Sequence, residues 1–207
     1  IGFMLISFAV TNFRSIRERV ELSLLKTGLK GLSSNYSKAP NKKQLLNAAV
    51  IYGPNASGKS NFIRAMQALE FLVHRSGGFK PDDTTRAYEP HRLERNCLEK
   101  PVVFEISFIS NKVQYDYLLS YTLERVEQEE LYYYPGHTRT LLYSRSADRE
   151  MKFGDYYKGP KKTLEKLLLP NQLFLSKAAE NNVEVILDAY RFFNKGFEVF
   201  SIMEEFD

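Results

Sequence analysis

The stretch Gly53-Pro-Asn-Ala-Ser-Gly-Lys-Ser60 fits the Walker A pattern G-x-x-x-x-G-K-[ST] at every defined position. Immediately before it, residues 49–52 (Ala-Val-Ile-Tyr) form a short apolar run that ends at a glycine, which is typical of a buried parallel strand. After it, apolar residues recur at helical spacing between Phe62 and Val73, so we expect a helix that begins at about Lys59. A strand, a glycine-rich turn and a helix N-terminus in this order predict a P-loop.

The chemistry of such a loop follows from its backbone. Amide N–H groups at the start of a helix face one concavity, and the helix dipole adds partial positive charge there, which suits a polyphosphate. Lys59 would reach the β- and γ-phosphates, and the Ser60 hydroxyl would be a ligand of Mg²⁺. The predicted nucleotide-binding residues of the loop are Gly53, Pro54, Asn55, Ala56, Ser57, Gly58, Lys59, Ser60 and Asn61.

Length and composition exclude several classes. The chain has 207 residues, 43% of them hydrophobic, which is enough for a sizeable core. Its formal charge of +4 permits a polyanionic partner without demanding one. No apolar run approaches the ~20 residues of a membrane span, and Cys97 is the single cysteine, so we expect a cytoplasmic protein without a membrane partner. Ile1–Phe3 precede Met4 and are interpreted as a remnant ahead of the natural start.

The rest of the chain predicts mainly antiparallel strands. Two strands, Leu5–Phe13 and Val20–Leu25, come before the P-loop. After the P-loop helix, alternating apolar runs separated by turns predict a β-meander over residues 102–109, 113–123, 126–134 and 140–144. Beyond it we expect a short strand at 173–175, a helix over 178–193 and a strand over 196–203. The predicted fold class is α/β with α+β elements, a P-loop NTPase whose antiparallel meander packs beside the P-loop strand and helix.

Two familiar P-loop classes fit poorly. A GTPase carries an Asn-Lys-x-Asp element that reads guanine, but Asn111-Lys112 is followed by Val-Gln and Asn194-Lys195 by Gly-Phe. A small-molecule kinase begins with its P-loop strand, whereas two strands precede it here. Both observations disfavour these classes.

The remaining motifs resemble another class in combination. Asn12-Phe-Arg-Ser15 follows the opening strand, then come the P-loop, the antiparallel block and the segment 173–182 (Leu-Phe-Leu-Ser-Lys-Ala-Ala-Glu-Asn-Asn). This order is similar to the ATP-binding half of ABC-class ATPases of the SMC/RecF/OLD kind. It is most similar to the bacterial AAA-type ATPases of abortive-infection and anti-phage loci, including the ATPase subunits of the Septu and PARIS antiviral defence systems.

The resemblance implies roles for further residues. Residues 4–207 would be the N-terminal lobe of an ATPase head, without the signature motif and the Walker B carboxylate, so no catalytic residue is assigned. Arg14 and Ser15 would approach the nucleotide, and Ser176 and Lys177 occupy the position of the family's Q-loop, although the glutamine itself is missing. The implied cofactors are ATP and Mg²⁺. The implied partners are a second head that sandwiches ATP, in a homodimer or higher oligomer, and an effector nuclease or toxin. We expect this lobe alone to bind Mg-ATP with little turnover.

Two other functions stay open. The lobe could be a nucleotide-dependent structural sensor or dimerisation module that controls an effector, with hydrolysis incidental. It could also be the DNA-binding module of a repair ATPase, because residues 137–166 hold eight Lys or Arg against four acids. The candidate DNA contacts are Lys158, Lys161 and Lys162, for which a solvated loop is the simpler explanation. The three histidines stand apart in the sequence and form no nuclease constellation.

Overall fold

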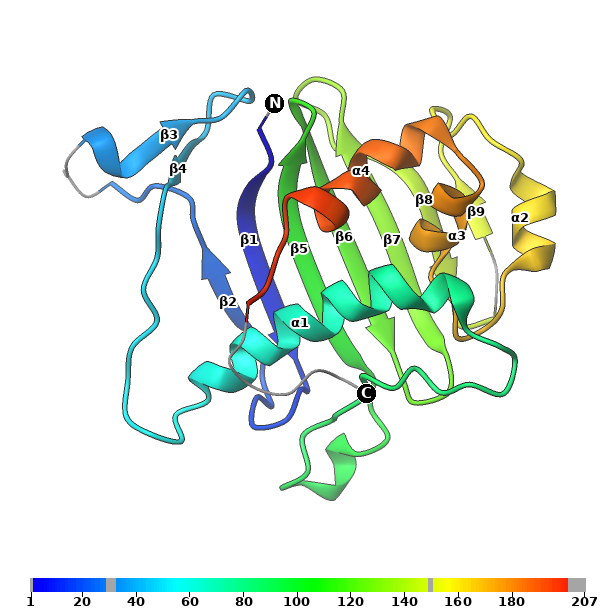
Figure 1. Cartoon of the computed structure of the whole chain (residues 1–207), viewed down its shortest axis with the longest axis horizontal. Helices are drawn as coiled ribbons and strands as arrows, with labels where there is room; N and C mark the ends of the chain where they lie inside the picture. The colour runs from blue at the N-terminus through cyan, green and yellow to red at the C-terminus, as the bar shows by residue number, and fades with distance from the viewer. Residues whose placement is uncertain (1, 29–32, 149–150, 201–207) are drawn as a thin grey trace.

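A computed structural model describes residues 2–28, 33–148 and 151–200 of the chain. Within these residues, seven strands form one antiparallel sheet in the order β2-β1-β5-β6-β7-β8-β9 (Figure 1). The strands are β1 (Met4–Thr11), β2 (Val20–Ser23), β5 (Val102–Ser110), β6 (Val113–Tyr121), β7 (Val126–Tyr134), β8 (Thr140–Ser146) and β9 (Met151–Phe153). The predicted opening strands and the predicted meander are therefore confirmed.

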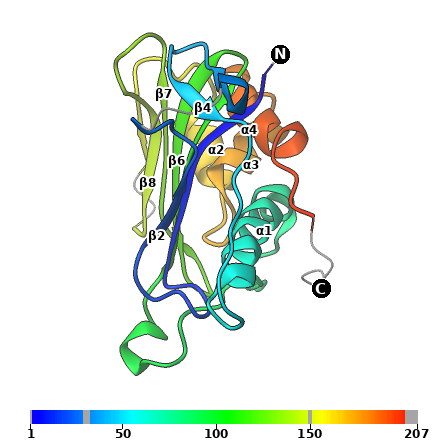
Figure 2. The same ribbon diagram turned by 90° about the vertical axis from the view of Figure 1, so that its left-hand side faces the viewer.

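Helices cover one face of this sheet. They are α1 (Lys59–Arg75), α2 (Lys161–Leu167), α3 (Phe174–Glu180) and α4 (Glu184–Lys195), with 3-10 turns η1 (Ser33–Asn35), η2 (Ser76–Gly78) and η3 (Arg95–Cys97). Figures 1 and 2 show α1, α3 and α4 on the same side of the sheet, with α2 beyond β8 and β9. The predicted P-loop helix begins at Lys59, as expected.

The core lies between the sheet and these helices. Along β5 the buried residues Phe104, Ile106 and Phe108 alternate with half-buried residues, the period of a strand with one face inside. The ring of Phe108 stacks on Phe192 of α4, with 4.1 Å between ring centroids. Each such side chain contributes about 2–3 kcal/mol through burial. Phe3, which we interpreted as part of a remnant, packs edge-on against Phe192 at 6.4 Å and belongs to the folded unit.

A small hairpin stands beside the main sheet. It consists of β3 (Tyr36–Lys38) and β4 (Gln44–Leu46) and has its own cluster of buried residues with β1 and β5. The amide of Leu46 donates to the carbonyl of Leu24 at 2.7 Å, which ties the hairpin to the end of β2.

The prediction of a strand before the P-loop is wrong. Residues 47–57 have no strand, and all of them are exposed; Val50 and Tyr52 are 83% and 89% exposed. A strand needs a neighbour that satisfies its backbone groups, and among the described residues none lies beside this run. The predicted parallel arrangement depended on that neighbour.

The C-terminal elements also differ from the prediction. Residues 174–175 open helix α3 instead of forming a strand. The predicted helix over 178–193 is divided between α3 and α4, because Asn182 takes a left-handed conformation with φ of 55°. Residues 196–200 form no strand, and the rest of that predicted strand lies outside the described residues.

Candidate functional site

The P-loop leads directly into α1. Gly58 has a φ of 95°, a left-handed conformation that costs a residue with a Cβ atom about 1–2 kcal/mol. A Cβ atom at Gly58 would also lie 3.2 Å from the hydroxyl oxygen of Ser15. A glycine at this position therefore permits both the turn and the close approach of the β1–β2 connection. The first amides of α1 have no partner within the helix, as at every helix N-terminus.

Lys59 folds back over the loop that precedes it. Its ammonium donates to the carbonyl oxygens of Gly53 at 2.8 Å and Pro54 at 2.6 Å, and lies 3.4 Å from the Ser57 hydroxyl. Neutral carbonyls bind an ammonium less strongly than a phosphate does. Lys59 is therefore held beside the glycine-rich loop by partners that bind it less strongly than an anion would.

The β1–β2 connection lies against the P-loop. The side-chain amide of Asn61 donates to the Ser15 hydroxyl at 2.6 Å, so the two predicted site segments touch, although they are 46 residues apart. A cavity of about 440 Å³ lies between them, within the usual size of small-ligand sites. Its lining includes the polar residues Ser15, Ser57 and Lys59 and the apolar residue Phe62, but neither Ser60 nor Asn61.

The β1–β2 connection also contributes charged residues to the lining of this cavity. Glu18 and Glu21 line the cavity, and each is in an ion pair: Glu18 with Arg17 at 2.9 Å and Glu21 with Arg19 at 2.7 Å. Because arginine already neutralises both carboxylates, neither stands out as a base that could activate water.

The other two polar side chains of the Asn12–Ser15 motif, Asn12 and Arg14, do not line the cavity. Arg14 pairs with Glu89 at 2.9 Å, and the cavity lining includes Ser15 but not Arg14. Asn12 is buried, and its amide nitrogen lies within hydrogen-bond distance of the carbonyl oxygens of Cys97, Lys100 and Pro101. The motif therefore anchors the loop that precedes β5 and contributes Ser15 to the P-loop.

The structure does not bring Ser176 and Lys177 to the P-loop. The Ser176 hydroxyl donates to the carbonyl of Val73 at 2.6 Å, in the last turn of α1. At 1.5 Å per residue, Val73 lies ~20 Å along the helix from Ser60. Lys177 lies 4.0 Å from Glu180 of its own helix. A direct contact between these residues and a magnesium ion held by Ser60 is incompatible with this arrangement.

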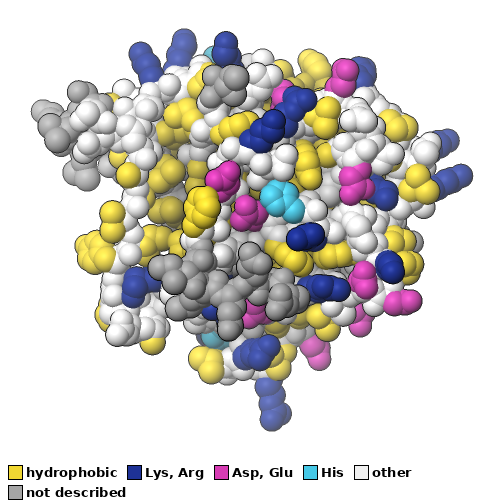
Figure 3. Space-filling model, viewed as in Figure 1, with side chains coloured by type: hydrophobic (Ala, Val, Ile, Leu, Met, Phe, Trp, Pro, Cys, Tyr) yellow, Lys and Arg dark blue, Asp and Glu magenta, His cyan; other side chains and the backbone are white. Residues whose placement is uncertain are grey.

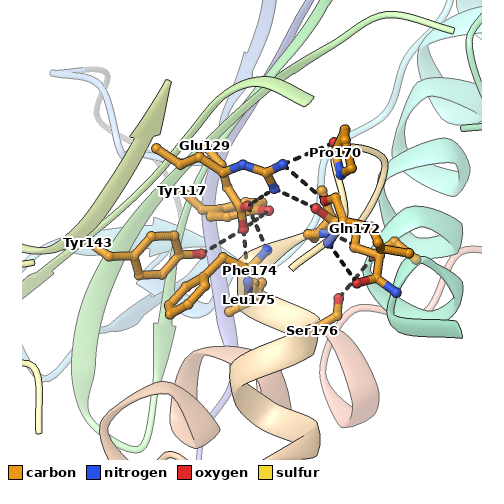
Figure 4. A network of polar contacts seen from close by, with 12 residues as sticks. Tyr117, Glu129, Tyr143, Pro170, Gln172, Phe174, Leu175 and Ser176 are labelled. Atoms are coloured by element: carbon orange, nitrogen blue, oxygen red, sulfur yellow. Dashed lines mark hydrogen bonds and ion pairs between the residues drawn. The ribbon is translucent and has the colours of Figure 1, made fainter. Parts of the chain in front are cut away.

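Sequence reasoning missed a buried carboxylate, Glu129 on β7. Its oxygens accept hydrogen bonds from the hydroxyls of Tyr117 at 3.1 Å and Tyr143 at 2.8 Å (Figure 4). They also accept from the amides of Phe174 at 2.7 Å and Leu175 at 2.9 Å, the first two residues of α3. Burial first, and the nearby Glu129 second, raise the pKa of Tyr117 and of Tyr143 well above its ordinary value, so both hydroxyls stay protonated and donate.

The same network continues to the end of α1. Arg145, which is 3% exposed, lies 3.9 Å from Glu129 and donates to the carbonyl of Gln172 at 2.6 Å. The side-chain amide of Gln172 donates to the carbonyls of Gly77 and Phe79 at 2.8 and 2.9 Å, just after α1. The Glu129 network therefore fixes the 169–176 segment between the sheet and α1. The sequence of β7 gives no signal for it, because residues 127–130 (Glu-Gln-Glu-Glu) are all polar and nothing marks Glu129 as the one that faces inward.

The candidate DNA contacts do not line the cavity beside the P-loop. Lys161 and Lys162 are exposed in the first turn of α2, with the Lys161 ammonium 5.5 Å from the centre of the Phe153 ring, and Lys158 is exposed in the preceding turn. Among the described residues, no three His, Cys, Asp or Glu side chains gather as a metal site. In that same part of the chain, no helix combines the length and the apolar character that crossing a membrane would require.

A comparison with protein families decides the class. Residues 48–197, well over half of the chain, match the family described as "AAA domain, putative AbiEii toxin, Type IV TA system". The chain belongs to this AAA domain family. The match begins just ahead of the P-loop and ends just after α4, so it includes the glycine-rich loop, the meander and the Glu129 network. A search of curated proteins found no match. The family makes this a P-loop ATPase domain related to abortive-infection systems.

Proposed function

We propose that this AAA domain binds Mg-ATP in the cavity between the P-loop and the β1–β2 connection. The observation that carries the proposal is the contact of Asn61 with Ser15, which places a second polar segment beside the glycine-rich loop. Lys59 would leave the carbonyls of Gly53 and Pro54 for the β- and γ-phosphates, and the Ser60 hydroxyl would ligate Mg²⁺. The base and ribose would lie against the apolar wall that includes Phe62.

We further propose that this domain is one lobe of a larger head, and that hydrolysis needs a second lobe and a second head. The exposed run 49–52 supports this, because Val50 and Tyr52 present apolar side chains to solvent immediately before the loop. A strand contributed by a further lobe would pair with that run and bury it. Phosphoryl transfer depends on positioning and charge stabilisation, so a lobe without an activating carboxylate binds far better than it cleaves.

The binding proposal is tested with a fluorescent ATP analogue, titrated in the presence of Mg²⁺. We expect Lys59→Ala to weaken binding at least 30-fold, and Lys166→Ala, an exposed lysine on α2, to leave it unchanged. Ser60→Ala should lose the part of the affinity that depends on Mg²⁺. Equal affinity of Lys59→Ala and the unaltered chain would show that nucleotide binds elsewhere.

The lobe proposal is tested by phosphate release and by light scattering. The 207-residue chain should release almost no phosphate from saturating ATP. Sustained turnover that disappears in Lys59→Ala would contradict the need for a further lobe. ATP-dependent dimerisation without phosphate release would instead support the alternative function, a nucleotide-dependent sensor or dimerisation module for an effector partner.

A further inference from the structure

Three turns that are far apart in sequence meet at one end of the sheet. They are the β3–β4 turn (residues 39–43), the β5–β6 turn (111–112) and the β7–β8 turn (135–139), which lie at the top of Figures 1 and 2. We name this edge the hairpin rim. The cations on it are Lys38, Lys42, Lys43, Lys112 and Arg139. Lys and Arg side chains stand close together along the upper edge of the space-filling view (Figure 3).

Two of these lysines occupy costly backbone positions. Lys42 has a φ of 67° and Lys112 a φ of 68°, the left-handed region in which glycine is the default turn residue. A residue with a Cβ atom costs about 1 kcal/mol or more there. Lysine therefore stands at both turn tips although glycine would be more stable there.

Side-chain contacts tie the turns together. The ammonium of Lys43 and the amide nitrogen of Asn41 both donate to the Oε1 atom of Gln114, at 3.0 and 2.8 Å. The Gln114 amide in turn donates to Asp116 at 3.2 Å. The β3–β4 hairpin is therefore fixed against β6, and the lysines of the hairpin rim keep their places relative to Lys112.

Arg139 completes the rim at its far end. Its guanidinium lies 3.5 Å above the centre of the Tyr132 ring, and its Nε atom bonds to Asp116 at 3.3 Å. The Arg139 side chain is 50% exposed, so part of the guanidinium remains open to solvent. An arginine stacked on an aromatic ring is pre-organised for a planar or phosphate-bearing ligand.

Few acids oppose these cations among the described residues of the rim. Asp116 accepts hydrogen bonds from Ser107 and Tyr134 as well as from Arg139. Asp188, which contacts Asn111 at 3.0 Å, is paired with Arg191 at 2.8 Å. The hairpin rim therefore carries a net positive charge.

We propose that the hairpin rim binds the phosphate backbone of a nucleic-acid duplex. The rim crosses β1, β5, β6 and β7, whose three inter-strand spacings of ~4.8 Å give a length of ~14 Å. A duplex segment of that length carries about eight phosphates. Lysines on turn tips fit a regular row of phosphates, which requires charge but little shape. The proposal differs from the α2 lysines inferred from sequence, and it does not depend on nucleotide binding at the P-loop.

The experiment compares two pairs of lysines that carry the same charge. Fluorescence anisotropy measures binding of 20-base-pair DNA and RNA duplexes of one sequence to the 207-residue chain at 50 mM salt. In the rim variant, Lys42→Gly with Lys112→Gly relieves both strained turns while removing two charges, so the fold is kept. In the control, Lys161→Ala with Lys162→Ala removes two charges from α2. We expect at least a 10-fold loss of affinity for the rim variant and less than 3-fold for the control.

Further measurements make the result specific. Loss of two phosphate contacts should reduce the slope of log affinity against log salt by about 2 in the rim variant. Arg139→Lys keeps the charge but loses the stack on Tyr132, and should bind about 3-fold more weakly. Binding of either duplex supports the proposal, and the tighter one names the nucleic acid. Absence of binding at 50 mM salt, an equal loss in the α2 control, or equally tight and rim-dependent binding of polyglutamate, which points to an acidic polypeptide partner, would each overturn it.

Discussion

The two ends of α1 are built in opposite ways. At its end, the Glu129 network surrounds buried polar groups with partners: Glu129 is fully buried, and Arg145 and Gln172 are each 3% exposed. At its start, Lys59 is held by carbonyls of its own loop, and the run before it exposes apolar side chains. One end is completed by this chain, whereas the other has its polar and apolar surfaces available to a ligand or a further lobe. The contrast separates what stabilises the domain from what we propose it binds with.

The largest effect should come from the C-terminal end of α1, where the Glu129 network lies. Glu129→Ala removes the two carboxylate oxygens that accept four hydrogen bonds and leaves the charge of Arg145 buried, so we expect a loss of about 3–5 kcal/mol in the free energy of unfolding. Urea denaturation measures it. Glu130→Ala, on the same strand but half-buried, is the matched control and should cost less than ~1 kcal/mol. Similar costs for the two would show that the network contributes little.

A smaller effect is expected at the N-terminal end of α1, beside the P-loop. Gly58→Ala places a Cβ atom at φ of 95° and 3.2 Å from the Ser15 hydroxyl, so it should cost about 1–2 kcal/mol of stability. It should also weaken binding of the ATP analogue, because the loop and Ser15 must separate. Gly136→Ala, in a turn where a Cβ atom meets nothing within 4 Å and φ is not positive, is the control. A Gly58→Ala variant as stable as the Gly136→Ala variant would argue against the close approach.

The smallest effect concerns Tyr157, whose buried hydroxyl has no hydrogen-bond partner among the described residues. Tyr157→Phe should change stability by no more than about 1 kcal/mol at pH 7, in the stabilising direction, because a hydroxyl without a partner is removed. Burial raises the pKa of Tyr157 to about 12, from an ordinary value of 10.0. Because the pKa is higher in the folded state, the free energy of unfolding of the wild type is independent of this group below pH 10 and falls as the pH rises toward 12. By pH 11 the variant should gain about 1 kcal/mol more over the wild type, as measured by urea denaturation at both pH values. An unchanged difference between pH 7 and 11 would contradict the raised pKa.

The sequence predicted the elements that depend on local patterns and missed those that depend on distant contacts. The alternating strands of the meander and the periodic α1 are local patterns, and both were found from the sequence. The strand at 49–52 was predicted from its apolar composition, but a strand forms only with a neighbour, and none lies beside it in the described residues. The position of Ser176 could not be inferred, because it depends on a contact with Val73, 103 residues away.

Sequence reasoning was similarly uneven for the site. The Walker A pattern located the loop, and the resemblance placed Ser15 beside it. Arg14 was wrongly expected at the site, because its partner, Glu89, comes from a loop with no recognisable sequence pattern. The hairpin rim could not be predicted from the sequence, because its lysines and arginine come from turns that only the folded sheet brings together.

The most direct test of the contrast between the two ends is hydrogen–deuterium exchange with and without Mg-ATP. Amides of residues 48–60 should exchange within seconds in the free chain, while those of β7 and α3 around Glu129 are protected. Saturating Mg-ATP should slow exchange in residues 53–60 and leave the Glu129 network unchanged, and Lys59→Ala should abolish the response. Protection of residues 53–60 before nucleotide is added, or no change at saturation, would contradict the account.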